Sequence, residues 1–119
     1  MARYLVLLPG PEEEWAQLSE EELAEGLKGH EEFWRQLTSH GHRVVTASPL
    51  TPSREATSMR FEPDGAVTVT EGPFTESAEQ IVGFYLLESE DEADLLKICE
   101  DLARTGNHLE IRRLESGDH

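Results

Sequence analysis

Three side chains in this sequence, His30, Glu71 and Glu76, have the chemistry of an acid–base site. An imidazole with a pKa of about 6.5 can accept or donate a proton near neutral pH, and a nearby carboxylate can orient it. Glu71 and Glu76 bracket a tight turn, so both can face one cavity as a pair of carboxylates. The sequence therefore predicts His30 as general base or acid, with Glu76 and Glu71 assisting.

Each of these side chains also has a purely structural interpretation. His30 lies in the apolar stripe of an expected helix, so it can be a core histidine that is hydrogen-bonded to backbone. Glu71 can cap its turn, and Glu76 can begin a helical turn. Gly72 and Pro73 are backbone devices, because glycine permits a positive φ and proline fixes the turn. The sequence leaves the catalytic and structural alternatives open.

The composition argues against several classes of protein. The 119 residues include 25 acidic and 10 basic side chains, a formal net charge of −15. Most of the surface would repel a phosphate backbone, so no direct nucleic-acid binding is expected. The single cysteine, Cys99, cannot form an internal disulfide, and no apolar run approaches about 18 residues. We expect an acidic, cytoplasmic protein that contacts no membrane.

No metal or other cofactor is predicted. His40 and His42 flank Gly41, but no Cys or His pattern has the spacing of zinc ligands. The first is better explained by the dipole of a helix end, and the second by the start of a strand. No nucleophile elbow, phosphate loop or dinucleotide fingerprint is present. Cys99 is interpreted as a small core hydrophobe.

The elements that must position these residues follow from hydrophobic periodicity and turn signals. Residues 2–8 form a nearly continuous apolar run, typical of a central strand buried on both faces. Residues 11–17 predict an acidic loop or short helix. Ser19 and Glu22 form a capping box for a helix that Gly41 ends. The apolar stripe of that helix contains Leu23, Leu27, His30, Trp34 and Leu37, with Phe33 beside it.

The second half of the chain predicts mostly strands. Strands are expected at 42–48, 57–62, 66–70, 81–87 and 108–114, with a hairpin turn at 63–65. Ser89 and Glu92 repeat the capping-box pattern and begin a second helix, which Gly106 ends. Its apolar face contains Leu95, Leu96, Cys99, Leu102 and Ala103. We expect one domain over residues 3–114 and a polar tail at 115–119.

This order of elements predicts an α+β fold, a ferredoxin-like sandwich. Two helices can cover only one face of such a sheet. The apolar runs at 4–8 and 81–87 are apolar on both faces, so the other face also needs a cover. A second copy of the same sheet is the economical cover, and we expect a homodimer whose sheets pack face to face.

The chain resembles the YCII-related proteins, and within them the DGPF-domain (DGPFAETKE) group. The resemblance rests on Tyr4-Leu5-Val6-Leu7-Leu8, His30-Glu31-Glu32-Phe33, Gly72-Pro73-Phe74-Thr75-Glu76, Gly83-Phe84-Tyr85-Leu86 and Leu109-Glu110-Ile111-Arg112. It implies a dimeric α+β barrel and a histidine in the first long helix, here His30. The chain departs from the group's motif at four positions: it has Glu71 where the motif has Asp, Thr75 where it has Ala, Ser77 where it has Thr, and Ala78 where it has Lys.

Two functions are compatible with these observations. The first is a small-molecule enzyme with a His–carboxylate acid–base site, whose ligand lies beside Trp34, Phe74, Thr75 and Tyr85. Related YCII proteins are described as candidate enzymes with a His–Asp pair. The resemblance therefore implies that this chain is a candidate enzyme as well. The alternative is a noncatalytic ligand-binding or regulatory module. Sigma-factor-linked signalling is the setting that the DGPF resemblance implies for it.

Overall fold

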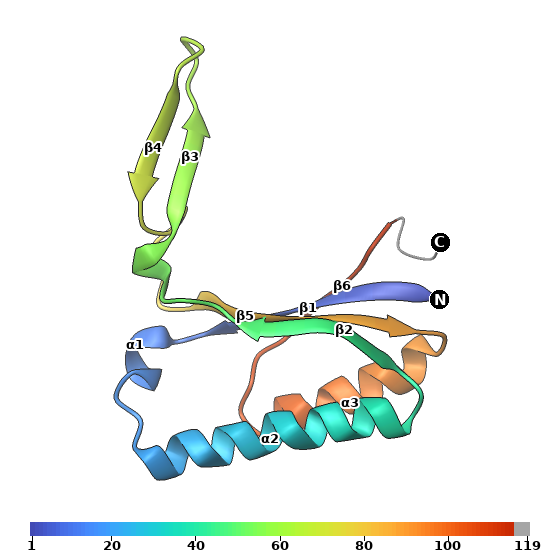
Figure 1. Cartoon of the computed structure of the whole chain (residues 1–119). Helices are drawn as coiled ribbons and strands as arrows, with labels where there is room; N and C mark the ends of the chain where they lie inside the picture. Colours follow the sequence, from blue (N-terminus) through green and yellow to red (C-terminus); the bar gives the residue numbers. More distant parts are fainter. Residues whose placement is uncertain (116–119) are drawn as a thin grey trace.

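A four-stranded antiparallel sheet with two long helices on one face forms the body of the protein (Figure 1). The computed structural model describes residues 1–115. The strands of this sheet lie in the order β2-β5-β1-β6, where β1 is Ala2–Gly10, β2 is Arg43–Pro49, β5 is Gln80–Ser89 and β6 is Glu110–Arg113. The long helices are α2 (Glu20–Ser39) and α3 (Glu92–Arg104). The α+β class is confirmed, and the strand order is consistent with a ferredoxin-like sandwich.

The central strand β1 is buried on one face only. It pairs with β5 on one side and β6 on the other, as a central strand should. Its even-numbered side chains Tyr4, Val6 and Leu8 are buried against the helices, whereas Leu5 and Leu7 are only half-buried. The prediction of a central strand is confirmed, whereas the predicted burial on both faces is wrong for the single chain. Residues 1–115 leave the second face of the sheet half-buried.

The first long helix begins as the sequence predicts, but its apolar stripe divides into two halves. Ser19 Oγ accepts from the Glu22 amide at 3.1 Å, and Glu22 accepts from the Ser19 amide at 3.0 Å, so the capping box is confirmed. Leu37 is fully buried, whereas Leu23 and Leu27 are 54% and 60% exposed. The sheet and α3 therefore bury only the C-terminal part of the stripe.

The second long helix corrects two predictions. Its N-cap is Asp91, whose side chain accepts from the Asp94 amide at 3.1 Å, so the capping box predicted at Ser89 is wrong. Ser89 is the buried last residue of β5, and its hydroxyl accepts from the Asp91 amide instead. The buried side chains of α3 are Leu95, Ile98, Cys99 and Leu102. Leu96 and Ala103, predicted on this face, are exposed.

The predicted core position of Cys99 is confirmed, and burial raises the pKa of its thiol to about 11.

The hairpin of β3 (Thr57–Phe61) and β4 (Val67–Glu71) forms a separate sheet that projects from the body, on the side opposite the helices (Figure 1). Met59 pairs with Val69 and Phe61 with Val67, so one face of the hairpin is apolar. Phe61 is 78% exposed. The radius of gyration is 16.6 Å, against about 13.5 Å for a compact chain of this length. An isolated hairpin is marginally stable in water, so a surface packed against this arm would stabilise it.

Two short helices flank the hairpin and the end of the sheet. They are α1 (Glu12–Trp15) and the 3₁₀ helix η1 (Ser53–Glu55). The Glu12 carboxylate connects them, because it accepts hydrogen bonds from the backbone amide and the hydroxyl of Ser53. In the described residues no helix combines the length and apolar character needed to span a membrane. Of the predicted tail at 115–119, Glu115 is exposed, and residues 116–119 lie outside the described residues.

A carboxylate on α3 joins that helix to the turn between α2 and β2. Asp94 Oδ2 lies 2.7 Å from Nε2 of the buried His42 and 3.0 Å from Nδ1 of His40. The hydrogen bond from His42 makes the largest contribution to holding the pKa of Asp94 below its ordinary value, and the hydrogen bond from His40 adds to it. The two histidines thus share one structural partner, a contact that the sequence pattern did not predict.

Trp15 packs directly on Gly10, and we expect alanine at position 10 to displace it. A Cβ on Gly10 would lie 2.2 Å from the nearest atom of the Trp15 indole, so the ring or β1 has to move. We expect the free energy of unfolding to fall by about 1–3 kcal/mol, as in other overpacked sites. Denaturant melts would measure the loss, and a red shift of tryptophan fluorescence would report the displaced indole.

Gly26→Ala is the matched control for Gly10→Ala. A Cβ on Gly26 meets nothing within 4 Å, and alanine favours a helix over glycine by up to about 1 kcal/mol. Its stability should therefore stay the same or rise. Unchanged fluorescence and stability in Gly10→Ala would show that the indole does not occupy this position.

Candidate functional site

A pocket of about 720 Å³ lies between α2 and the end of the sheet formed by β2 and β5. We call it the His30 pocket. Its lining residues are Leu8, Trp15, Leu27, His30, Glu31, Trp34, Arg35, Ala47, Ser48, Pro49, Val82, Gly83, Phe84 and Tyr85. Most of this wall is aliphatic or aromatic. A largely apolar pocket of this size with a few polar groups is typical of small-molecule sites.

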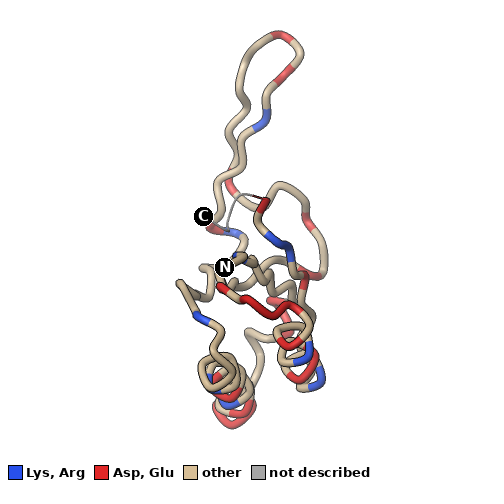
Figure 2. Tube along the Cα trace, turned by 90° about the vertical axis from the view of Figure 1, so that its right-hand side faces the viewer, with Lys and Arg blue, Asp and Glu red and all other residues tan. Residues whose placement is uncertain are grey.

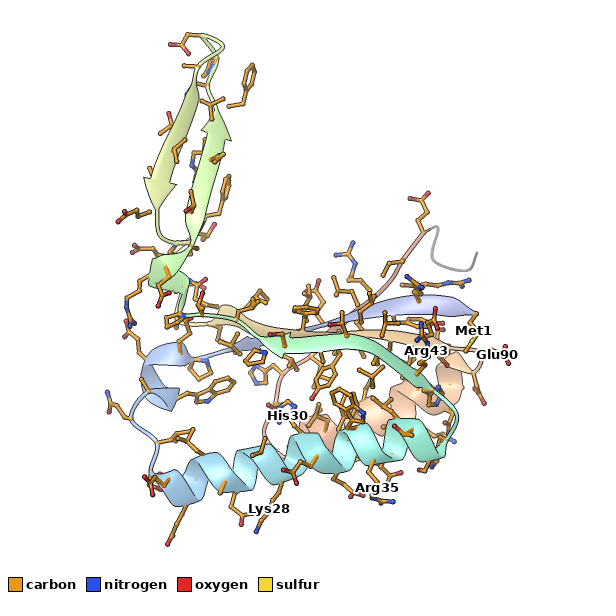
Figure 3. All side chains as sticks on the ribbon, viewed as in Figure 1. Met1, Lys28, His30, Arg35, Arg43 and Glu90 are labelled. Carbon is orange, nitrogen blue, oxygen red and sulfur yellow. The ribbon has the colours of Figure 1, made fainter. Side chains whose placement is uncertain are left out.

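The polar centre of the pocket is a hydrogen bond between α2 and β5. His30 extends from α2 toward the sheet (Figure 3), and its Nδ1 lies 2.7 Å from the Tyr85 hydroxyl oxygen. The two rings are stacked, with centroids 5.9 Å apart and an angle of 8° between their planes. Phe33 and Trp34 pack edge-on against Tyr85, with centroids 4.9 and 6.3 Å away. Aromatic packing therefore fixes the orientation of the pair.

Burial keeps both members of this pair neutral near pH 7. It lowers the pKa of His30 below its ordinary value, and a hydrogen bond to the Asn107 side chain opposes this shift. Burial also raises the pKa of Tyr85 to about 12. Because Tyr85 keeps its proton, its O–H can donate to Nδ1 of a neutral His30, and the ring proton then lies on Nε2. The pair offers hydrogen bonds without a net charge.

The structure brings together some of the predicted site residues and separates others. His30, Trp34 and Tyr85 all line the His30 pocket. Glu71 and Glu76 line a second pocket of about 580 Å³, which we call the acidic hollow. Its other lining residues are Pro11, Glu12, Glu13, Glu14, Ser53, Arg54, Gly72, Pro73, Ser77, Ala78 and Gln80. Within one chain, the predicted carboxylates and His30 therefore belong to different pockets.

The position of the hairpin explains this separation. His30 extends from α2 toward the helix face of the sheet (Figure 3), whereas β3 and β4 leave the sheet on its other side (Figure 1). The segment 71–79 returns from the hairpin to the start of β5, next to α1. Gly72 makes this return with φ of +106°, as its predicted role as a backbone device requires.

Phe74 and Thr75, predicted to bind a ligand, line neither pocket. The Arg60 guanidinium lies 4.1 Å from the centroid of the Phe74 ring, and its Nη2 donates to the Phe74 carbonyl at 3.0 Å. The Thr75 carbonyl accepts from the side-chain amide of Gln80 at 3.0 Å. Both residues have structural contacts in the loop before β5, and their ligand-binding roles stay predictions.

The sequence did not identify several residues of the pocket wall. Leu27 lies three residues before His30 and Glu31 one residue after it, and helical spacing could have placed Leu27 beside His30. No local pattern could have placed Trp15 there, because the turn of α1 folds it back onto Gly10. Residues 1–115 contain no group of three or more His, Cys, Asp or Glu side chains that could hold a metal ion.

Fold and pocket together define an α+β protein with a ligand-sized pocket between its helix layer and its sheet. The model of the YCII-related domain matches residues 2–115, so the chain belongs to the YCII-related domain family. The predicted YCII resemblance is thereby confirmed. No match was found among curated proteins.

Proposed function

We propose that the protein binds a small molecule with an apolar body in the His30 pocket. The observation that carries this proposal is the neutral His30–Tyr85 pair, held at 2.7 Å in a wall that is mostly apolar and aromatic. Such a wall favours an apolar ligand through burial, and one polar pair orients it through hydrogen bonds. The regulatory setting implied by the DGPF resemblance is compatible with this role.

Binding without catalysis is favoured by the surroundings of His30. Its Nδ1 is already engaged by the Tyr85 hydroxyl. Among the described residues no carboxylate is hydrogen-bonded to His30, so the usual orienting partner of a catalytic histidine is missing from a single chain. Acid–base catalysis is the second candidate. It is supported by the lowered pKa of His30, which keeps the ring in its basic form near pH 7.

We also propose that two copies pair through their open sheet faces, as a dimeric α+β barrel. The even-numbered residues Phe84 and Leu86 of β5 and their neighbours Leu5 and Leu7 on β1 are half-buried on this face. Arg3 and Arg43 pair with Glu88 at its border, at 2.9 and 2.7 Å. The hairpin projects on the same side, so it can contact a sheet packed there (Figure 1).

A thermal-shift screen of small molecules tests the binding proposal. We expect at least one ligand to raise the melting temperature of the wild-type protein, because binding to the folded state stabilises it. Tyr85→Phe keeps the ring and removes one hydrogen bond, so affinity for that ligand should fall about 2- to 10-fold. His30→Ala should weaken it further. Calorimetric titration would measure both losses.

His108→Ala is the control, since His108 is exposed and outside the pocket, paired with Glu79. Equal affinity in wild type, Tyr85→Phe and His30→Ala would place the ligand elsewhere and refute the proposed site. Turnover of the ligand that His30→Ala abolishes would favour the enzyme over the binding module.

A further inference from the structure

We infer that the ligand of the His30 pocket is a hydrophobic amine, an apolar body that carries one ammonium group. This inference rests on the proposed function and adds the charge of the ligand to it. The charges around the pocket and the exposed Trp34 favour such a ligand over an anion, and the neutral His30–Tyr85 pair does not repel it.

The pocket has one uncompensated charge in its wall, the carboxylate of Glu31. Its two lining residues with a full charge are Glu31 and Arg35. Arg35 donates from Nε and Nη2 to the two carboxylate oxygens of Glu32, with Nε at 2.9 Å, so its charge is compensated on the helix itself. Within residues 1–115, Glu31 makes no side-chain hydrogen bond and no ion pair. A ligand ammonium can pair with this exposed carboxylate.

The charge of the whole helix layer acts in the same direction. Figure 2 shows acidic residues along both long helices. On α2 the second basic side chain, Lys28, is likewise paired with an acidic neighbour, Glu25, at 3.3 Å. The chain carries a net charge of −15. A field of this sign raises the local concentration of cations and repels anionic ligands.

The aromatic wall suits an ammonium group and its apolar body together. Trp34 is 46% exposed and lies three residues after Glu31, so the indole and the carboxylate are neighbours on the surface of α2. A cation over an indole face gains about 0.5–1 kcal/mol at an exposed site. Leu8, Leu27 and Ala47 leave an apolar surface for the rest of the ligand. His30 is neutral near pH 7 and does not repel the cation, because burial lowers its pKa.

Three probes with the same naphthyl body test the charge of the ligand. They are 1-naphthylmethylamine, 1-naphthylmethanol and 1-naphthoate, titrated calorimetrically into the full chain at neutral pH and at low and high salt. We expect the amine to bind about tenfold more tightly than the alcohol, and the carboxylate to bind most weakly. High salt should lower the affinity of the protein for the amine and leave its affinity for the alcohol unchanged.

Glu31→Gln should reduce the affinity for the amine about three- to fivefold and leave the affinity for the alcohol unchanged. Glu21→Gln is the matched control, because it removes the same charge from α2 at a position outside the pocket. Equal affinity of amine and alcohol, or equal losses in the two variants, would overturn the inference while the binding function stands. If none of the three probes binds, the inference and the proposed function both fail.

Discussion

Leu37→Ala is expected to lower the free energy of unfolding by about 2–5 kcal/mol. Leu37 is fully buried in the core, where α2 meets the sheet and α3. Its truncation removes the transfer free energy of the lost atoms and leaves a cavity in a close-packed interior. Urea or guanidinium unfolding, followed by circular dichroism, would measure the loss.

Leu23→Ala is the matched control from the same helix and the same sequence stripe. Leu23 is 54% exposed, so alanine should change stability by no more than about 0.5 kcal/mol. Alanine also has the best helix propensity, which partly offsets the lost contacts. Equal losses in the two variants would mean that the N-terminal half of α2 is buried as well, as the sequence alone predicted.

Leu86→Arg is expected to convert the proposed homodimer into a monomer. Leu86 pairs with Leu5 in the middle of the open sheet face. In the proposed dimer an arginine there would be buried without a partner, and such a charge costs several kcal/mol. In the monomer the same side chain can reach water from a half-exposed position. Sedimentation equilibrium at micromolar concentration should show two chains for the wild type and one for the variant.

Leu96→Arg provides the control for this substitution. Leu96 is an exposed leucine on α3, in the helix layer and away from the open face. The Leu96→Arg variant should stay dimeric, and circular dichroism should show that both variants fold. A wild-type protein that sediments as a monomer would refute the homodimer. A dimer that Leu86→Arg leaves intact would exclude the open face as its interface.

Much of the candidate site could be predicted from local sequence, because local hydrogen bonds and side-chain periodicity determine it. His30 and Trp34 lie four residues apart on one helix, so they share a face wherever that helix packs. Tyr85 was predicted from its aromatic ring, and its position in β5 turns it toward the helices. The hydrogen bond between His30 and Tyr85 joins residues 55 positions apart. No local pattern specifies that contact.

The sequence by itself determined the family, the α+β class, the capping box at Ser19 and the hairpin turn, which depend on motif, periodicity and turn residues. Only the tertiary structure decided which half of the α2 stripe is buried, because burial depends on where the sheet ends. It also decided that Glu71 and Glu76 lie in the acidic hollow and that Tyr85 is the partner of His30. The turn at 71–76 determines only the local backbone direction of Glu71 and Glu76. Which pocket these side chains line depends on the side of the sheet from which the hairpin projects.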